Sequence, residues 1–180
     1  MSHEMLTDLY EFSMANGYFQ TFNHDKQARF DIFYRKAPDE DSFVVAAGLL
    51  QIVQEVKNWH FSKEDIDYLR SLHKFSDGFL NYLAQAKNEC TIKAMPEGIP
   101  LLPQEPVISV SGPIMEVQLL ETLVLNIFNH QSLIATKSWQ ISSVTKGKAI
   151  MEFGARRAQG PDAATYGARA AVIGGCTSTS

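Results

Sequence analysis

The sequence predicts an α/β protein with a mixed α+β domain near residues 1–112, followed by the opening of a parallel β/α system over residues 113–180. Two observations carry this prediction. Residues 90–113 hold five prolines between short β-rich runs, which is typical of strands that keep proline at edges and bends. After residue 113 the pattern becomes helix, strand, helix and strand, and this alternation predicts parallel strands joined by helices.

Helical patterns dominate the first 86 residues, with one clear strand among them. Thr7 is predicted to cap a helix over residues 8–19, and the loose alternation of residues 28–36 predicts a strand. Ser62, with Asp65 three residues on, has the spacing of a capping box that opens a helix. A turn is expected at residues 38–42 and a short buried strand at residues 43–48. Three helices are expected at residues 49–59, 63–72 and 77–86.

The segment after residue 113 contains a long helical pattern that is apolar on nearly all sides. Residues 115–129 carry this character most strongly, and such a helix is normally buried between layers or against a partner. Strands are then predicted at residues 148–153 and 171–175, on either side of a helix over residues 161–171.

Composition and motif spacing exclude several classes of protein. A formal net charge of -4 over 180 residues argues against a nucleic-acid surface, and no stretch resembles a signal peptide or a membrane span. Two separated cysteines fit a reducing compartment, so a soluble cytoplasmic protein is expected. The five histidines lack metal-ligand spacing, and no metal site is predicted. No GxSxG elbow or Walker A loop occurs.

The ends of the last two predicted strands hold the residues with the clearest chemistry. Phe153, Gly154, Arg156 and Arg157 follow the first strand, and glycines with hydroxyl residues follow the second, over residues 174–180. Ligands gather at the carboxyl ends of parallel strands, where arginine pairs with carboxylate or phosphate and an aromatic ring offers a flat face. The pattern predicts a site for an anion joined to a ring. A core phenylalanine, a solvated arginine pair and an ordinary turn remain open alternatives.

These strand ends and several upstream segments resemble one known family. "FGARRAQGPD" and "GGCTSTS" are similar to the FG-x-RRA-x-G-x-D segment and the glycine turn that open the barrel of nicotinate phosphoribosyltransferases. "LTDLYEFSMANGYF", "FDIFYRKAP", "FVVAAGL" and "NHQSLIATK" resemble further segments of that family in the family's order. The resemblance implies an irregular β/α barrel of the type II phosphoribosyltransferase kind. Residues 113–180 would supply the helical connection and first strands of that barrel, which is incomplete here.

The resemblance also implies an activity. The family joins nicotinate to 5-phosphoribosyl diphosphate, giving nicotinate mononucleotide and diphosphate in NAD salvage. ATP hydrolysis drives the reaction, and Mg²⁺ accompanies the phosphates. By the same resemblance we expect a homodimer with shared active sites. The composition adds the expectation of a cytoplasmic protein with no nucleic-acid or membrane partner.

The family's substrate-binding residues carry over to matching positions. Phe153 would stack on the pyridine ring, and Arg156 would face the nicotinate carboxylate or a phosphate. Thr179 and Ser180 would bind substrate at the second strand end. Tyr10 would reach the other subunit's active site in the dimer and close the ring sandwich.

Two arginines and one serine have further expected roles. Arg35 and Arg157 are candidates for phosphate binding, or for supporting the loop or a neighbouring acid. Relatives that use the amide carry an aspartate at the position resembling Ser180. An aspartate repels a carboxylate, whereas a serine hydroxyl donates to it, so Ser180 favours nicotinate over nicotinamide.

The main departure from the family is length, because family members run well beyond 180 residues. The phosphorylated histidine is expected after Ser180, so no catalytic residue can be assigned, and a chain ending there is expected to lack turnover and to aggregate unless a partner covers it. Two other interpretations stay open. One is a non-catalytic truncated paralogue that dimerises with or regulates a full enzyme through the apolar helix. The other is an amide-specific or quinolinate-using relative.

Overall fold

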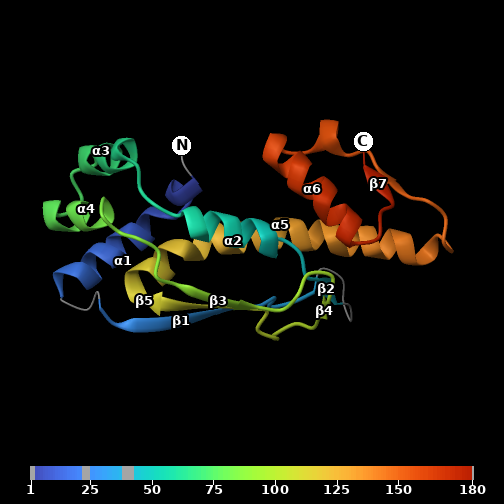
Figure 1. Cartoon of the computed structure of the whole chain (residues 1–180), viewed down its shortest axis with the longest axis horizontal. Coiled ribbons are helices and arrows are strands. Elements are labelled where there is room, and N and C mark those ends of the chain that lie inside the picture. The colour runs from blue at the N-terminus through green and yellow to red at the C-terminus, as the bar shows by residue number, and fades with distance from the viewer. Residues whose placement is uncertain (1–2, 22–24, 38–42, 180) are drawn as a thin grey trace. The chain divides into compact units, whose positions relative to one another are not determined.

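A computed structural model describes residues 3–21, 25–37 and 43–179 of the chain (Figure 1). The predicted turn at residues 38–42 and Ser180 lie outside the described residues. The helices are η1 (His3–Met5), α1 (Leu9–Gln20), α2 (Leu49–Asn58), α3 (Lys63–Ser71), α4 (Asp77–Leu83), α5 (Ile114–Val144), η2 (Ala155–Arg157) and α6 (Pro161–Ile173). The strands are β1 (Gln27–Ile32), β2 (Val44–Val45), β3 (Thr91–Ala94), β4 (Pro100–Leu101), β5 (Ile108–Pro113), β6 (Met151–Glu152) and β7 (Ser178–Thr179).

Packing divides the chain into two compact units whose segments alternate along the sequence. Unit 1 takes residues up to Asp31, then Ile52–Lys93 and Ser109–Leu125. Unit 2 takes Ile32–Gln51, Ala94–Ile108 and the residues from Asn126 on. Helix α5 contributes residues to both units. The predicted domain boundary between residues 112 and 113 stays a prediction.

Local capping explains where the helices of unit 1 begin. The predicted capping box of α3 is confirmed: Ser62 Oγ accepts from the Asp65 N–H at 3.1 Å, and Asp65 Oδ2 accepts from the Ser62 N–H at 3.0 Å. The predicted cap of α1 is wrong, because Asp8 precedes the helix and makes no side-chain cap hydrogen bond. Thr7 lies one residue too early, and its buried hydroxyl has no hydrogen-bond partner among the described residues.

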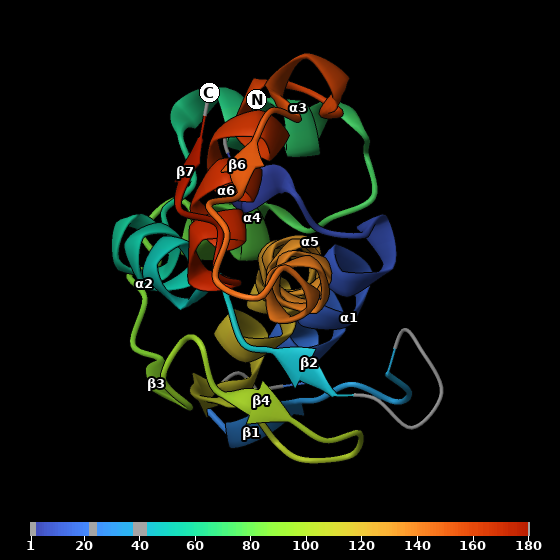
Figure 2. The ribbon, with the colours of Figure 1, turned by 90° about the vertical axis from the view of Figure 1, so that its right-hand side faces the viewer.

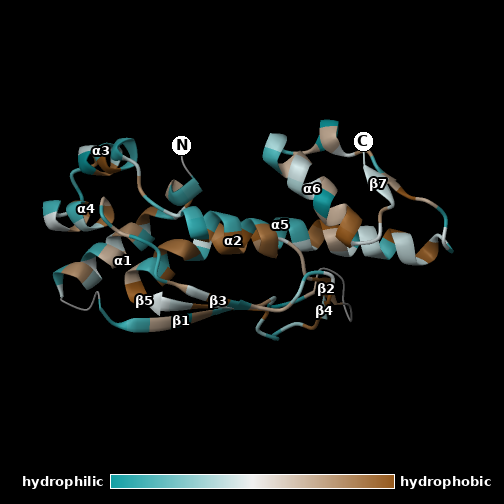
Figure 3. Ribbon diagram, in the orientation of Figure 1, coloured by the Kyte–Doolittle hydropathy of each residue, from teal (hydrophilic) through white to brown (hydrophobic). Residues whose placement is uncertain are grey.

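Aromatic side chains form much of the core of unit 1. Phe12 of α1 contacts Phe61 and Phe75, with ring centroids 5.8 Å and 6.1 Å away, and Phe75 contacts Phe79 of α4 at 5.9 Å. Tilted ring pairs at these distances add to the stabilisation from burial. Alternating teal and brown bands on α2 in Figure 3 agree with the predicted amphipathic helix, in which Ile52 and Val56 are buried.

The long helix α5 is buried within the chain itself. Its first half places a series of apolar side chains in the core, each at most 5% exposed: Met115, Val117, Leu119, Leu120, Leu123, Val124, Ile127 and Phe128. Burial of this helix was predicted. The expectation that its apolar sides offer a surface to a partner is wrong for these residues, and the truncated-paralogue interpretation loses that support.

The strands form small sheets. β5 lies between β1 and β3 in one sheet, and β2 pairs antiparallel with β4, with Val44 opposite Leu101. The first strand was predicted to continue to residue 36 but ends at Ile32. Beyond it the Tyr34 carbonyl accepts from the Gln104 N–H at 2.8 Å, so the backbone bonds to a loop.

In unit 2, hydroxyl groups of α5 accept hydrogen bonds from backbone N–H groups in and after β2, as a neighbouring strand would. Thr136 Oγ1 accepts from the Val45 N–H at 2.9 Å, and Ser132 Oγ accepts from the Ala47 N–H at 3.1 Å. The "NHQSLIATK" segment thereby satisfies buried backbone donors that would otherwise be unpaired. Small residues let the elements approach closely, since Val45, Ala47, Ala135 and Ala170 form one buried cluster. Figure 2, which looks along α5, shows β2 and α6 beside that helix.

The predicted parallel strand pair near the C-terminal end is confirmed, but one strand was misplaced. Residues 171–173 belong to α6, and the second strand is β7 at Ser178–Thr179. Gly174 ends the helix, and its N–H bonds to the Ala170 carbonyl at 3.0 Å. A short apolar run fits a strand, but the alanines before this one favour a helix, and they pack it against α5.

Candidate functional site at the ends of two parallel strands

Strands β6 and β7 run parallel, with Met151 opposite Ser178 and Glu152 opposite Thr179. Thr177 extends the pairing, because its N–H and its hydroxyl each donate to the Ile150 carbonyl at 2.8 Å. Parallel strands end at the same edge of a sheet. Phe153 therefore leaves β6 beside the end of β7, where Thr179 lies. The two strand ends predicted to share a site are adjacent.

The segment after β6 is a tight turn that presents its side chains outward. The Gly154 N–H donates to Glu152 Oε1, and the Arg157 N–H donates to the Gly154 carbonyl at 2.7 Å, which forms η2. A Cβ at position 154 would meet the Glu152 carboxylate, so a larger residue there would displace this flexible side chain from the Gly154 N–H. Phe153 is 59% exposed and both arginines are exposed.

Strand β6 is not a buried strand, although its residues are largely apolar, since Met151 is 54% exposed. The exposure of Phe153 also excludes its interpretation as a core residue of the described chain. A large aromatic face held in solvent on a short strand is available to stack on a planar ring.

A pocket of about 400 Å³ lies on one side of this segment, within unit 2. Glu152, Gly154 and Arg157 contribute to its lining from the strand end, and His130 from α5. His130 Nε2 lies 3.3 Å from the Ala163 carbonyl of α6. Ala158 and Gln159 follow Arg157 in the wall, and α5 and α6 add small or apolar residues: Ile134, Ala163, Ala164, Gly167 and Ala168. Arg157 thus lines the same cavity as Glu152, and its role in phosphate binding or in supporting the loop or a neighbouring acid stays a prediction.

The remaining predicted residues lie elsewhere. Tyr10 is on α1 in unit 1 and is 54% exposed, and the negative charge of Glu11 raises its pKa. Arg35 follows β1 and is exposed, and its carbonyl accepts from Gln104 Nε2 at 3.2 Å. Gly174 and Gly175 precede β7, so they end a helix and do not follow a strand as expected.

Comparison with known proteins decides the family. The model of the nicotinate phosphoribosyltransferase (NAPRTase) N-terminal domain matches residues 5–129, more than half of the chain. The chain belongs to the nicotinate phosphoribosyltransferase family. The family resemblance found in the sequence is therefore confirmed.

Relatives agree over nearly the whole chain. Nicotinate phosphoribosyltransferases of Mycobacterium tuberculosis and Bacillus subtilis are each 40% identical to it, over 98% and 97% of this chain, but only 38% and 36% of their own lengths are covered. The human nicotinic acid phosphoribosyltransferase structure superposes with a TM-score of 0.89 at 34% identity, covering 96% of this chain and 35% of that one. The chain thus spans little more than a third of these relatives.

The predicted fold class is confirmed by these structures. A nicotinate-nucleotide pyrophosphorylase from Pyrococcus furiosus also superposes, with a TM-score of 0.75 at 24% identity, and this likeness concerns the fold alone. A mixed α/β chain of the type II phosphoribosyltransferase kind is therefore established.

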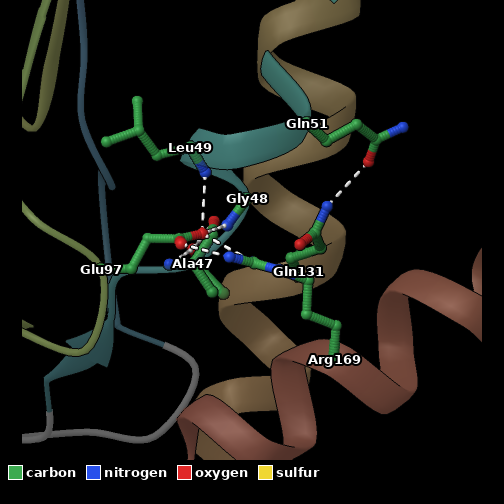
Figure 4. A network of polar contacts seen from close by, with 8 residues as sticks. Ala47, Gly48, Leu49, Gln51, Glu97, Gln131 and Arg169 are labelled. Atoms are coloured by element: carbon green, nitrogen blue, oxygen red, sulfur yellow. Dashed lines mark hydrogen bonds and ion pairs between the residues drawn. The ribbon is translucent and has the colours of Figure 1, made fainter. Parts of the chain in front are cut away.

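One network beside the site was not found from the sequence of this family member. Glu97 accepts from the N–H groups of Gly48 and Leu49 at 2.7 Å and 3.0 Å, at the start of α2 (Figure 4). Arg169 of α6 donates to both carboxylate oxygens of Glu97, at 2.9 Å and 2.6 Å. Burial opposes ionisation of Glu97, but hydrogen bonds from Arg169 and the backbone outweigh it and lower its pKa.

This network anchors the helix that forms one wall of the pocket. Arg169 follows pocket-lining Ala168 directly, so the ion pair fixes the end of that wall. Beside it, fully buried Gln131 donates to Gln51 Oε1 at 2.7 Å (Figure 4). Glu97 and Arg169 are 72 residues apart, and no local pattern marks such a pair in a single sequence.

Proposed function

We propose that the protein forms nicotinate mononucleotide and diphosphate from nicotinate and 5-phosphoribosyl diphosphate in NAD biosynthesis. The observation that carries this proposal is the placement of Phe153, Arg156 and Thr179 of the family's strand-end segments at one edge of a parallel pair. In the reaction the ring nitrogen forms a bond to C1 of the ribose while the bond from C1 to the diphosphate oxygen breaks. The protein then chiefly positions two anions and neutralises charge.

Each strand-end residue has a role that follows from its chemistry. Phe153 stacks on the pyridine ring, because its exposed face is large and flat. Arg156 pairs with the nicotinate carboxylate or a phosphate through two parallel hydrogen bonds. The Thr179 hydroxyl and that of Ser180, which lies outside the described residues, donate to substrate oxygens. Ser180 thereby favours nicotinate over nicotinamide.

Arg157 and Arg35 have supporting roles in this proposal. Arg157 lines the neighbouring pocket with Glu152, where it holds the turn that carries Phe153 and Arg156. Arg35 is exposed after β1 and is a candidate contact for a phosphate. No residue of the described chain is assigned to bond making or breaking.

ATP coupling and Mg²⁺ are part of the proposal through the family alone. In the described part of the chain no three His, Cys, Asp or Glu side chains lie together as metal ligands. The described residues therefore do not form a protein cage for Mg²⁺, and we propose that the ion enters with the phosphates.

We further propose a cytoplasmic homodimer in which Tyr10 of each subunit closes the ring sandwich of the other. Tyr10 is available for such a contact because it is exposed on α1. None of the described helices is long and apolar enough to cross a membrane. Mixing two variants with weakened nicotinate binding, Tyr10→Ala and Phe153→Ala, at a nicotinate concentration well below the KM of either variant tests the shared site. Recovery of about a quarter of wild-type activity supports it, and no recovery contradicts it.

Product analysis tests the activity directly. The full-length protein is incubated with ATP, Mg²⁺, 5-phosphoribosyl diphosphate and either nicotinate or nicotinamide, and mononucleotides are separated by chromatography. Nicotinate mononucleotide should form, with little product from nicotinamide. Equal use of both bases would contradict the role of Ser180, and absence of both products would contradict the proposed function.

A further inference from the structure

The parallel strands β6 and β7 have little in their own side chains to hold them in register. Each strand is two residues long, and Met151 of β6 and the following Phe153 are more than half exposed in the described chain. Register is strongly specified where one face of a strand is buried, and weakly specified where neither face is. Another contact must therefore decide which residues of the two strands lie opposite each other.

Thr177, the residue before β7, makes such a contact with both backbone groups of Ile150, the residue before β6. Its hydroxyl oxygen accepts from the Ile150 N–H at 3.1 Å, and the same hydroxyl donates to the Ile150 carbonyl at 2.8 Å. The Thr177 N–H donates to that carbonyl as well, also at 2.8 Å. A hydroxyl group can donate and accept at once, and Thr177 uses both functions on one residue. The side chain thereby fixes the start of β6 at one position along β7.

The segment that carries Thr177 is itself held by α5 and α6. The Cys176 N–H donates to the Ala171 carbonyl of α6 at 2.9 Å, and Ser142 Oγ of α5 donates to the Gly174 carbonyl at 2.9 Å. Cys176 is 8% exposed, so the residue directly before Thr177 is buried. Thr177 therefore joins a fixed segment to β6.

The segment that leads into β6 is held more loosely. Lys148 and Ala149 are exposed, and the Lys148 N–H donates to the Thr145 carbonyl at 3.2 Å, within the turn that follows α5. Among the described residues, Thr177 has the only side chain that forms a hydrogen bond with Ile150. The position of β6 along β7 thus depends on the Thr177 hydroxyl.

We propose that Thr177 is a positioning residue for the reaction proposed above, an inference that rests on that function. Its hydroxyl locks the register that brings Phe153 and Thr179 to the same edge of the strand pair. Phe153 stacks on the pyridine ring and Thr179 donates to substrate oxygens, so a change in their relative position moves the ring away from the atom that it attacks. A displacement of about 1 Å at a reacting centre can cost about 100-fold in rate. Thr177 acts through these two residues and does not itself contact substrate.

Valine and serine at position 177 separate the hydroxyl from the shape of the side chain. Thr177→Val keeps the branched shape but loses both hydroxyl hydrogen bonds, which should lower kcat/KM for nicotinate about 5- to 30-fold in the full-length protein. Thr177→Ser keeps the hydroxyl and should stay within about threefold of wild type. Thr165→Val on α6 is the matched control, because the exposed Thr165 hydroxyl donates only to the Pro161 carbonyl of its own helix, at 3.1 Å, and kcat/KM should not change.

Backbone amide exchange of the same full-length variants gives a readout that does not depend on activity. Peptides that cover residues 149–153 should exchange at least about fivefold faster in Thr177→Val, and at the wild-type rate in Thr177→Ser. Peptides from α6 should exchange at the wild-type rate in both variants, because the Cys176 and Gly174 contacts remain. If Thr177→Val does not fold, Thr177→Ala takes its place in both measurements.

The two measurements separate failure of this inference from failure of the proposed function. A wild-type protein that forms no nicotinate mononucleotide would overturn the proposed function, and the exchange rates would still decide whether the hydroxyl holds β6. With an active wild type, an unchanged kcat/KM in Thr177→Val, or equal losses in the valine and serine variants, would overturn the positioning role. Unchanged exchange over residues 149–153 in Thr177→Val would overturn it as well.

Discussion

Glu152 and Thr179 lie opposite each other in register on the parallel strands β6 and β7. This single pairing fixes which residues meet at the strand ends, because a shift by one residue would turn each side chain to the other face. It places exposed Phe153 next to Thr179 and starts the turn that carries Arg156 and Arg157. The candidate site therefore depends on a two-residue strand pair, supported by Thr177 and by α6.

Removing the Phe153 ring should weaken binding of the pyridine substrate. A stacking contact with an aromatic base is worth about 1–3 kcal/mol, so Phe153→Ala should raise the KM for nicotinate about 5- to 150-fold. The KM for 5-phosphoribosyl diphosphate should change little. Phe153→Tyr keeps the ring and should stay within about threefold of wild type in steady-state kinetics; an unaffected nicotinate KM in the alanine variant would refute stacking.

Gly174 should tolerate no side chain, although its backbone conformation is ordinary. Its φ is -76°, but a Cβ would lie 2.1 Å from the Ala135 carbonyl oxygen. Gly174→Ala should lower the free energy of unfolding by about 2–3 kcal/mol, as overpacking does. Gly17→Ala in α1 is the matched control, since no atom lies within 4 Å of its added Cβ.

Urea denaturation of the two glycine variants separates packing from helix propensity. Gly17→Ala should be neutral or more stable by about 0.5–1 kcal/mol, because alanine favours the helix. A Gly174→Ala variant as stable as wild type would show that α6 does not pack against α5 at this distance.

The Glu97 network should contribute to stability more than an exposed ion pair does. Glu97→Gln leaves an acceptor for Gly48 and Leu49 but removes the charge that Arg169 pairs with, which should cost about 1–3 kcal/mol. Asp67→Asn, at the exposed pair with Arg70, should cost about 0.5 kcal/mol or less. Thermal unfolding in low and high salt compares them, and equal losses in both variants would contradict a special role for Glu97.

Buried Glu11 should make stability depend on pH in the opposite sense to most carboxyl groups. Burial raises its pKa to about 7, with smaller effects of Glu121 and Asp8, although Thr122 donates to it at 3.2 Å. In the unfolded chain the group ionises near its ordinary pKa of 4.5. The raised pKa of Glu11 therefore adds fully to the free energy of unfolding below pH 4.5. This stabilisation is lost as the pH rises to about 7, and the loss is at most about 3 kcal/mol.

Glu11→Gln should remove that loss. Between pH 5 and pH 8 the free energy of unfolding of this variant should rise relative to that of wild type, as measured by urea denaturation at each pH. Glu64→Gln, at an exposed position, should show the same pH dependence as wild type. A constant difference between Glu11→Gln and wild type over this range would mean that Glu11 is ionised throughout.

The sequence predicted those features of the fold that depend only on residues close together in the chain. The Ser62 and Asp65 capping box and α5 were predictable because spacing and periodicity alone determine them. The end of α6 was not predictable, because "AVIGG" fits a strand as well as the end of a helix. Only the close approach of Gly174 to Ala135 selects the helix, and that contact is tertiary.

In the candidate site, too, local features were predictable from the sequence and contacts between distant residues were not. Phe153 and Arg156 could be named as candidates because the strand-end rule and the family's motif act on adjacent residues, and their roles stay predictions. The anchoring of α6 by Glu97 and Arg169 was missed because ion pairs between distant residues leave no local signal. The exposure of Phe153 could not be decided from the sequence, because its apolar neighbours also fit a core phenylalanine.

The dependence of turnover on Arg156 tests the central claim most directly. We would measure kcat/KM for nicotinate in the full-length protein and in Arg156→Gln, with Arg70→Gln of unit 1 as the control. A lost charge-assisted pair of about 1.5–3 kcal/mol predicts a fall of roughly 10- to 150-fold in Arg156→Gln and no change in the control. Wild-type kinetics in Arg156→Gln would contradict the assignment of the β6 and β7 strand ends as the nicotinate site.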